Sequence, residues 1–358
     1  MELGLFMMPL HPPARPLADT LDEDLELLVE ADRLGYTEAW IGEHQTLAWE
    51  PIPAPDIFIA KALALTRNIR LGPGVVLLQQ HHPAMVANRI ALLDHLSRGR
   101  INFGIGVGGV PTDHELLDLD GVRGDHQAMW HECIELVLKL WASEAPFDHR
   151  GKYWRVGIRK PRPEIGLGVT PKPFQKPHPP IGVAGVTPRS ASHRYAGERG
   201  WYPMSINFAA PPALRAHWAN YSEGARAAGR TPDRHVWRIA RDIFVGETTA
   251  EAREYALNGA IARGFKSWLL PQFDGAPERL AVFKRDPAMA DRDVTVEYLV
   301  DNVWIVGDPG ECARKLRALH EEVGGFGVLL ALAHDWDDKA RWLRSMRLLA
   351  QEVVPHLP

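Results

Sequence analysis

Several side chains with acid–base or hydrogen-bonding chemistry lie just past short apolar runs in the sequence. Glu43 and His44 follow one such run, a glycine run at 106–109 follows another, and Ser205 and Asn207 follow a third. If the runs are strands of a parallel α/β barrel, their carboxyl ends meet at one mouth, where such enzymes carry out chemistry. An imidazole titrates near neutral pH, and both of its nitrogens can carry a proton. His44 is therefore suited to general acid–base catalysis.

A second group of residues precedes a predicted helix and suits the binding of an anion. Gly185, Val186 and Ser190 stand at the start of the helix expected at 190–199. Main-chain N–H groups and a hydroxyl at a helix N-terminus attract negative charge. We therefore predict a phosphate-binding turn here.

The run at 104–109 satisfies the G-x-G-x-x-G pattern but does not predict a dinucleotide site. A dinucleotide-binding turn opens directly into a helix, whereas Pro111 follows this run and the next strong helical pattern starts much later. The chain also lacks a G-x-S-x-G elbow, a P-loop and an H-E-x-x-H helix, which argues against serine hydrolase, P-loop and zincin chemistry. The two cysteines, Cys133 and Cys312, cannot form a multi-cysteine zinc site, and we expect no metal.

The elements that must position these residues alternate between short apolar runs and helical patterns. Strands are predicted at 3–8, 39–41, 71–78, 101–105, 181–184, 202–205, 236–245 and 327–331. Helices are predicted at 17–35, 56–66, 84–96, 127–141, 190–199, 212–228, 250–261 and 338–353. Eight β/α units in one chain favour a closed (β/α)8 TIM barrel over an open doubly wound sheet. We expect a single α/β domain over 1–358, with long insertion loops at about 143–180 and 271–300.

Composition narrows the partners and the compartment. The 358 residues carry a formal net charge of −4, which provides no basic field to attract nucleic acid. Two cysteines suit a reducing compartment. The start of the sequence lacks a basic, cleavable leader, and no stretch approaches the length of a membrane span. We therefore expect a cytoplasmic protein that binds neither nucleic acid nor a membrane.

Several motifs resemble those of the bacterial-luciferase-like superfamily of flavin-dependent oxidoreductases. They are WIGEH at 40–44, RLGPGVV at 70–76, LDHLSRGRINFG at 93–104, VAGVTPRS at 183–190 and VGDPGEC at 306–312. The run LSRGRINFG at 96–104 is the most specific of these motifs. The resemblance spans nearly the whole chain apart from the two long loops.

The resemblance implies a role for each group of residues. It implies that His44 lies beside a flavin ring as general acid and base, with Glu43 under the ring or at its edge. It implies a cis peptide between Gly74 and Val75 against the flavin. It also implies that the turn at 185–190 holds the flavin phosphate. The remaining cofactor-binding candidates are Gly106, Val107 and Gly108, which pass the flavin tail, and Ser205, which follows the sixth strand.

The sequence departs from luciferase itself at two of these positions. Gly106 and Val107 stand where the luciferase α subunit has a reactive cysteine and a phosphate-binding arginine. Light emission is therefore not expected, and the continuation PTDH at 111–114 resembles the limonene-monooxygenase-like branch of the superfamily.

The resemblance implies a two-component monooxygenase that receives reduced FMN from a separate flavin reductase. It would use O2 to oxygenate a small apolar organic substrate through a C4a-peroxyflavin, and it would form a homodimer. One alternative is a deazaflavin-dependent dehydrogenase or reductase on the same fold, because a basic cradle for a long acidic tail could be built from Arg155, Arg159, Lys160 and Arg162. The other alternative is a flavin-binding barrel without catalysis.

Overall fold

A parallel sheet closed into a barrel forms the centre of the molecule. The computed structural model describes residues 1–119, 125–273 and 280–358. The barrel strands are β1 Glu2–Met7, β2 Glu38–Ile41, β3 Arg70–Pro73, β4 Val76–Leu77, β5 Phe103–Gly106, β8 Ile181–Gly185, β9 Tyr202–Ser205, β10 Arg238–Arg241 and β13 Val328–Leu332. Neighbours in the sheet follow the order β3-β2-β1-β13-β10-β9-β8-β5-β4. A parallel bridge between Leu71 and Ile101 joins β3 to the segment that leads into β5. The sheet is therefore the predicted (β/α)8 barrel, with β3 and β4 sharing the third strand position.

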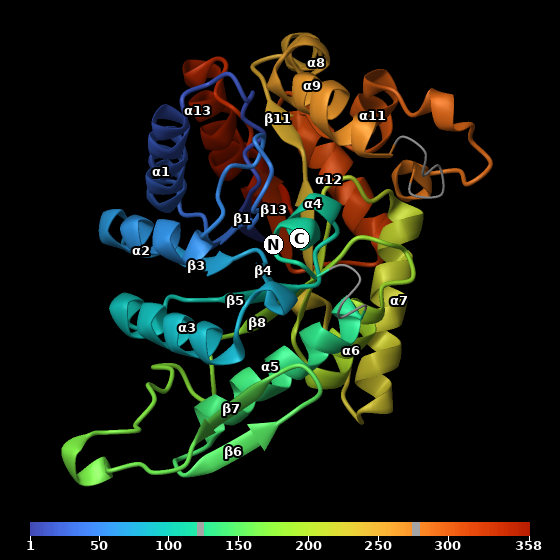
Figure 1. Cartoon of the computed structure of the whole chain (residues 1–358). Coiled ribbons are helices and arrows are strands. Elements are labelled where there is room, and N and C mark those ends of the chain that lie inside the picture. The colour runs from blue at the N-terminus through green and yellow to red at the C-terminus, as the bar shows by residue number, and fades with distance from the viewer. Residues whose placement is uncertain (120–124, 274–279) are drawn as a thin grey trace.

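Helices surround the sheet on its outer face (Figure 1). They are α1 Leu17–Arg33, α2 Pro55–Leu65, α3 Pro83–Ser97, α4 Pro111–Leu116, α5 His126–Ala142, α6 Ala191–Arg199, α7 Pro211–Ala227, α8 Thr249–Asn258, α9 Ala260–Gly264, α11 Val296–Asn302, α12 Pro309–Val323 and α13 Lys339–Leu348. The apolar faces of the helices pack on the outward side chains of the strands, such as Leu5, Ile41 and Leu71. In the part of the chain that the structure describes, no helix is both long enough and apolar enough to cross a membrane.

A separate cluster fills the inside of the barrel. Trp40 packs there with Met204, Ala240, Val328 and Leu330. Gly182 of β8 leaves room for the indole, since an added Cβ there would lie 2.8 Å from the Trp40 ring. At the amino-terminal end of the barrel, Glu38 forms a buried ion pair with Arg238 at 3.0 Å. The interior is thus a packed core, and ligands can approach only at the mouth.

Two of the predicted strands are divided in the structure, and the apolar periodicity of the sequence does not reveal these divisions. The strand expected at 71–78 divides into β3 and β4, and the peptide between Gly74 and Val75, which lies between them, is cis. The strand expected at 236–245 begins later, as β10, and is interrupted at Asp242. β11 Ile243–Val245 then pairs in parallel with β12 Ile305–Gly307, a strand that the sequence analysis missed.

Helical predictions are corrected at several places: α12 was not among the predicted ranges, and the helix expected at 338–353 ends as α13 at Leu348. The helix expected at 250–261 ends at Asn258, because Gly259 has an extended conformation, and α9 starts afresh. The glycine run at 106–109 was expected to lead to no nearby helix, but α4 begins at Pro111. Pro at the first helical position and Asp113 in the first turn are helix-start signals, which were overlooked because the helix is so short.

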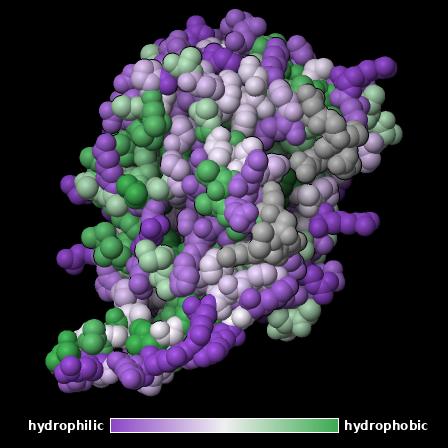
Figure 2. Space-filling model, viewed as in Figure 1, coloured by the Kyte–Doolittle hydropathy of each residue, from purple (hydrophilic) through white to green (hydrophobic). Residues whose placement is uncertain are grey.

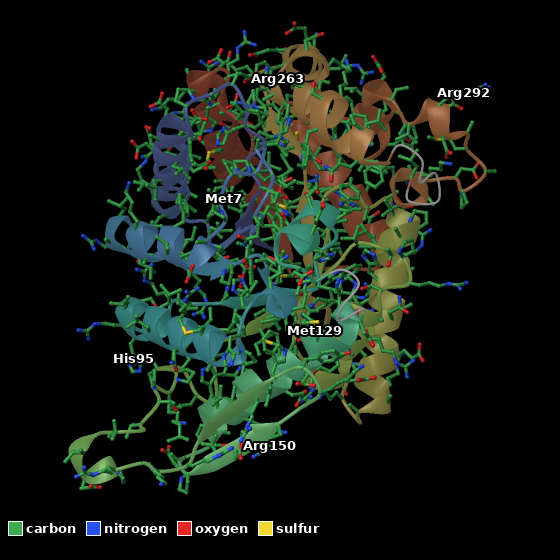
Figure 3. The ribbon with its side chains drawn as sticks, viewed as in Figure 1. Met7, His95, Met129, Arg150, Arg263 and Arg292 are labelled. Carbon is green, nitrogen blue, oxygen red and sulfur yellow. The ribbon has the colours of Figure 1, made fainter. Side chains whose placement is uncertain are left out.

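The two long loops contain secondary structure of their own. Segment 143–180 holds an antiparallel hairpin of β6 Phe147–Arg150 and β7 Arg155–Ile158, followed by the short 3-10 helix η2 Pro163–Ile165. Figure 1 shows this hairpin outside the barrel, beyond α5, and Arg150 is labelled on it in Figure 3. Segment 271–300 includes α11 and short helical turns, while 274–279 lie outside the described residues.

Candidate active site

The barrel mouth brings together residues from the ends of three neighbouring strands. His44 lies three residues past β2, the cis peptide at Gly74–Val75 separates β3 from β4, and Gly106 ends β5. Leu77 and Gly106 are paired in the sheet. A Cβ added at Gly106 would lie 2.4 Å from Val75 Cγ2, so only glycine allows this approach. The predicted residues His44, Gly74, Val75 and Gly106 therefore lie at one end of the barrel.

His44 lies between two carboxylates, one on each side of its ring. Its Nδ1 donates a hydrogen bond to Asp113 Oδ2 at 3.3 Å, and its Nε2 lies 3.2 Å from Glu50 Oε2. The His44 side chain is 14% exposed, while those of Glu50 and Asp113 are 7% and 0% exposed. Both ring nitrogens can face a carboxylate favourably only if both carry a proton. The geometry therefore describes an imidazolium.

The electrostatics of His44 agree with this geometry. Burial of the ring by itself lowers the pKa of His44, but the charge of Glu50 and the hydrogen bond to Asp113 outweigh burial and raise the pKa to about 10. For Asp113, burial opposes ionisation, yet the hydrogen bonds from His44 and Thr46 lower its pKa. At neutral pH the pair is ionised.

Asp113 is a site residue that the sequence analysis did not select. Its Oδ1 accepts hydrogen bonds from the main-chain N–H groups of Gln45 at 3.2 Å and Thr46 at 2.8 Å. The Thr46 hydroxyl donates to the same oxygen. Because α4 lies in the fourth β/α unit and His44 in the second, Asp113 fixes the loop after β2 against a distant segment. The sequence signal for Asp113 was its place in the first turn of α4.

Glu43 faces away from His44, as expected for neighbouring residues in an extended segment. Its carboxylate accepts from Leu77 N at 3.2 Å and from Gln45 Nε2 at 3.0 Å, and Oε1 lies 2.5 Å from His81 Nε2. Glu43 and His81 line a pocket that residues of α2 and α3 also line. In this position Glu43 supports the strand that carries the cis peptide.

The turn before α6 has the features of an anion site. Ser190 Oγ accepts a hydrogen bond from His193 N at 3.2 Å, which leaves the hydroxyl proton of Ser190 available to a ligand. Ser190 is buried and Val186 is 43% exposed. A Cβ at Gly185 would lie 2.7 Å from Ser190 Oγ, so glycine is required for the hydroxyl to fit. The turn therefore offers a helix N-terminus and a hydroxyl donor.

Ser205 lies behind this turn and holds it in place. His217 Nε2 is 2.9 Å from the Thr187 carbonyl, which can only accept, so Nε2 carries the ring proton. Burial lowers the pKa of His217 to about 4, so the ring is neutral and its Nδ1 accepts from the Ser205 hydroxyl at 3.0 Å. Ser205 Oγ also accepts from Trp237 Nε1 at 2.9 Å. The hydroxyl proton of Ser205 is thus donated to His217 and is not available to a ligand.

The run at 106–109 extends past the end of β5 and carries one side chain, that of Val107. Gly108 has φ of +73°, a backbone conformation that favours glycine, and a Cβ there would approach Leu77 Cδ2 at 3.0 Å. The carbonyl of Val107 accepts a hydrogen bond from Gln79 Nε2. A glycine-lined wall and a helix N-terminus without a carboxylate suit a flat ring that carries a phosphate, and these residues fit FMN.

One further cluster gathers side chains that could bind a metal ion. His11, Glu23 and Asp335 place potential ligand atoms within 4.8 Å of one another. The guanidinium of Arg15 bridges Glu23, at 2.8 Å, and Asp335. Arg15 therefore already supplies the positive charge that a metal ion would bring.

Comparison with known proteins identifies close relatives. Residues 1–325 match the family described as luciferase-like monooxygenase. The chain is 35% identical to 3,6-diketocamphane 1,6-monooxygenase of Pseudomonas putida, covering 100% of this chain and 98% of that protein. It is 31% identical to limonene 1,2-monooxygenase of Rhodococcus erythropolis, covering 99% of this chain and 86% of that protein. The solved FMN complex of a type II Baeyer-Villiger monooxygenase, the oxygenating constituent of 3,6-diketocamphane monooxygenase from Pseudomonas putida, superposes with a TM-score of 0.93 at 35% identity. That superposition covers 100% of this chain and 99% of the other.

Proposed function

The chain belongs to the luciferase-like monooxygenase family, and we propose that it is the oxygenating component of a two-component flavin-dependent monooxygenase. It would take reduced FMN from a separate flavin reductase and use O2 to oxygenate a small apolar organic substrate. The similarity to an oxygenating constituent solved with FMN, over the full length of both chains, supports this assignment.

The observation that carries the proposal is the position of His44. It lies at the barrel mouth near the cis peptide of Gly74–Val75, and Asp113 fixes its Nδ1. An imidazolium in this place can donate the proton on Nε2 to an oxygen atom of a bound ligand. Reduced FMN, when bound, supplies the electrons that activate O2.

The cofactor-binding residues follow from the same geometry. We assign the phosphate to the turn formed by Gly185, Val186 and Ser190, and the ring to the wall formed by Gly74, Val75 and the run at 106–108. We assign Glu43 and Ser205 supporting positions, because their polar atoms are bound within the protein.

A deazaflavin coenzyme is less well supported than FMN. The basic residues that could have cradled its acidic tail lie on or after β7, in the hairpin that projects beyond α5 (Figure 1). Arg155 and Arg159 pair there with Asp148, and Arg162 pairs with Glu164. These side chains are exposed, and Asp148 and Glu164 offset part of their positive charge.

We also propose a homodimer that forms through α2 and α3. Large apolar side chains of these adjacent helices are exposed, namely Ile57, Leu65, Met85, Leu92 and Leu96. Figure 2 shows hydrophobic residues on the side of the molecule that carries α2 and α3. Apolar residues gathered in this way are characteristic of a protein–protein interface. Both cysteines are buried free thiols, which supports placing the protein in the cytoplasm.

The proposal is tested by rapid mixing. The purified protein is mixed anaerobically with reduced FMN and then with O2, while flavin absorbance is followed. We expect the protein to bind reduced FMN and to delay its reoxidation relative to free flavin. We expect His44→Asn to bind reduced FMN but to oxygenate a panel of cyclic ketones and terpenes at least ~100-fold more slowly.

The matched control is His82→Asn. His82 also follows a strand, but its Nδ1 caps α3 by accepting from Ala84 N at 3.2 Å, a role that asparagine can fill. Failure of the unaltered protein to bind reduced FMN would overturn the proposal, and equal turnover of the two variants would overturn the role of His44.

A further inference from the structure

Glu50 connects His44 to a second loop at the barrel mouth. It lies in the loop between β2 and α2 and is 6% exposed. Its Oε2 lies at an ion-pair distance of 3.2 Å from His44 Nε2 but accepts no hydrogen bond from the described residues, while its Oε1 accepts a hydrogen bond from Trp268 Nε1 at 2.9 Å. One carboxylate therefore contacts both the imidazole and an indole from a distant part of the chain.

Trp268 belongs to the short helical turn η4 Phe265–Leu269, which follows α9. Phe265 anchors the start of this turn in the core, at 3% exposure, whereas Trp268 is partly exposed. The same turn leads into the long loop that starts at 271. The contact between Trp268 and Glu50 thus joins the loop after the second strand to the segment that precedes that long loop.

The two carboxylates beside His44 are held very differently. Asp113 is fully buried and accepts from two main-chain N–H groups and the Thr46 hydroxyl in addition to His44. Among the described residues, Glu50 has His44 and Trp268 as its side-chain partners. Asp113 therefore fixes the Nδ1 side of the His44 ring. The carboxylate that faces Nε2, that of Glu50, is held within the described part of the chain only by the contact between its own loop and Trp268.

We propose that Glu50 is a positioning residue that faces Nε2 of His44 as its ion-pair partner, and that Trp268 couples this contact to the position of the 265–273 segment. While Trp268 binds Glu50, the Nε2 proton faces a carboxylate and is kept from a ligand. When the segment moves and Glu50 withdraws, Nε2 becomes the free donor at the mouth, still oriented by Asp113 through Nδ1. The role of His44 in turnover rests on the proposed function, but the contact itself does not.

The charged groups that face His44 come from two elements. Among the described residues they are Glu50, from the loop after β2, and Asp113, from α4. The neighbours Thr46 and Trp268 are neutral. Both charges favour the imidazolium, so removing either one alone should lower the pKa of His44 without abolishing the bond to the other.

The test is an NMR titration of the ligand-free full-length protein labelled in its histidine rings. The His44 signals are assigned by their loss in His44→Asn. Glu50→Gln keeps the shape of the side chain and removes its charge, and we expect it to lower the pKa of His44 by about one unit or more. Trp268→Phe removes the indole N–H, and we expect a smaller decrease with exchange broadening of the Nε2 signal.

Trp49→Phe is the matched control for the indole. Trp49 precedes Glu50 in the same loop, and the backbone carbonyl through which it binds His11 N is retained. We expect the His44 pKa to be unchanged in this variant. A His44 pKa in Glu50→Gln equal to that of the unaltered protein would overturn the role of Glu50. No change in Trp268→Phe, or an equal change in Trp49→Phe, would overturn the coupling.

Activity provides a separate readout. With reduced FMN and O2, we expect the alkaline limb of the pH profile of kcat to move to lower pH in Glu50→Gln, by about the same amount as the His44 pKa. If the unaltered protein does not oxygenate any probe, the proposed function fails while the titration still decides the role of Glu50. If oxygenation occurs but the limb does not move, Glu50 does not position the proton used in turnover.

Discussion

Two carboxylates face one imidazole at the barrel mouth, and this fixes the charge of His44 before any ligand binds. A free histidine would be mostly neutral at pH 7, but Glu50 and Asp113 raise the pKa of His44 to about 10. His44 is thus protonated at neutral pH and can act as an acid. Its neighbour Glu43 has a different role, because its carboxylate holds Leu77 N on the next strand.

The phosphate turn gives a prediction at the scale of one residue. Ser190→Asp keeps a good N-cap for α6 but places a negative charge where the phosphate is expected. We expect FMN to bind at least ~10-fold more weakly while the melting temperature stays nearly constant, because a carboxylate repels the anion. Binding is measured by titration of FMN fluorescence.

Thr248→Asp is the control for this substitution. Thr248 caps α8 in the same manner, by accepting from Glu251 N at 3.1 Å. The control should bind FMN as the unaltered protein does. Equal affinity in Ser190→Asp would show that the phosphate lies elsewhere.

Individual elements determine how closely the residues of the mouth can approach one another. The third strand position is divided at Gly74–Val75, and β5 can approach this break only because position 106 has no side chain. The short helix α4 then carries Asp113 back across the mouth to the loop after β2. The site thus depends on three local features of the barrel: the divided third strand, the glycine at position 106 and the six-residue helix α4.

The α3 helix gives a prediction at the scale of an element. Met85, Leu92 and Leu96 are seven and four residues apart, so they form one stripe along the exposed face of α3. In a homodimer this stripe would be covered. We expect the unaltered protein to sediment as a dimer and the double variant Leu92→Glu, Leu96→Glu to sediment as a monomer, because the charges cannot be buried unpaired.

Leu17→Glu is the control, since Leu17 is 53% exposed at the start of α1. This variant should remain dimeric. A monomeric unaltered protein, or a double variant that still sediments as a dimer, would contradict the proposed interface. Sedimentation velocity over a range of concentrations distinguishes these outcomes.

At the scale of the whole molecule, a buried charged network joins the first β/α unit to the last. His11 follows β1, and its Nδ1 lies 2.8 Å from Asp335, which follows β13, while its Nε2 lies 3.2 Å from Asp24 of α1. Arg15 and Arg263, the latter labelled in Figure 3, also pair with Asp335. The ends of the chain that close the barrel are therefore held by ion pairs as well as by the pairing of β1 with β13.

This network predicts how stability depends on pH. Burial lowers the pKa of His11, but hydrogen bonds to Asp24 and Asp335 outweigh it and raise the pKa from 6.5 to about 9. The folded state therefore retains a proton that the unfolded chain releases above its own value of 6.5. The stabilisation is complete below that pH and is lost as the pH rises through about 9, and His44 acts in the same direction.

We expect the free energy of unfolding in urea to fall between pH 7 and pH 9.5, with a contribution from His11 of up to about 3 kcal/mol. His11→Asn should be less stable at pH 7 and should show a smaller slope. The control, His235→Asn, changes an exposed histidine and should keep the slope of the unaltered protein. Stability that rises over this range would contradict the assigned protonation of His11.

The sequence by itself determined the barrel, the order of its main strands and helices, and the places where chemistry is possible. Apolar runs alternate with helical patterns, and parallel strands direct all their carboxyl ends to one mouth, so His44, Gly74, Gly106 and Ser190 could be selected from local pattern and resemblance. The tertiary structure alone decided which groups contact them. Asp113 and Trp268 reach His44 and Glu50 from other β/α units, and Glu43 turns away although it is the next residue. Such contacts depend on the paths of loops, which have no period in the sequence and are fixed only when distant segments pack together.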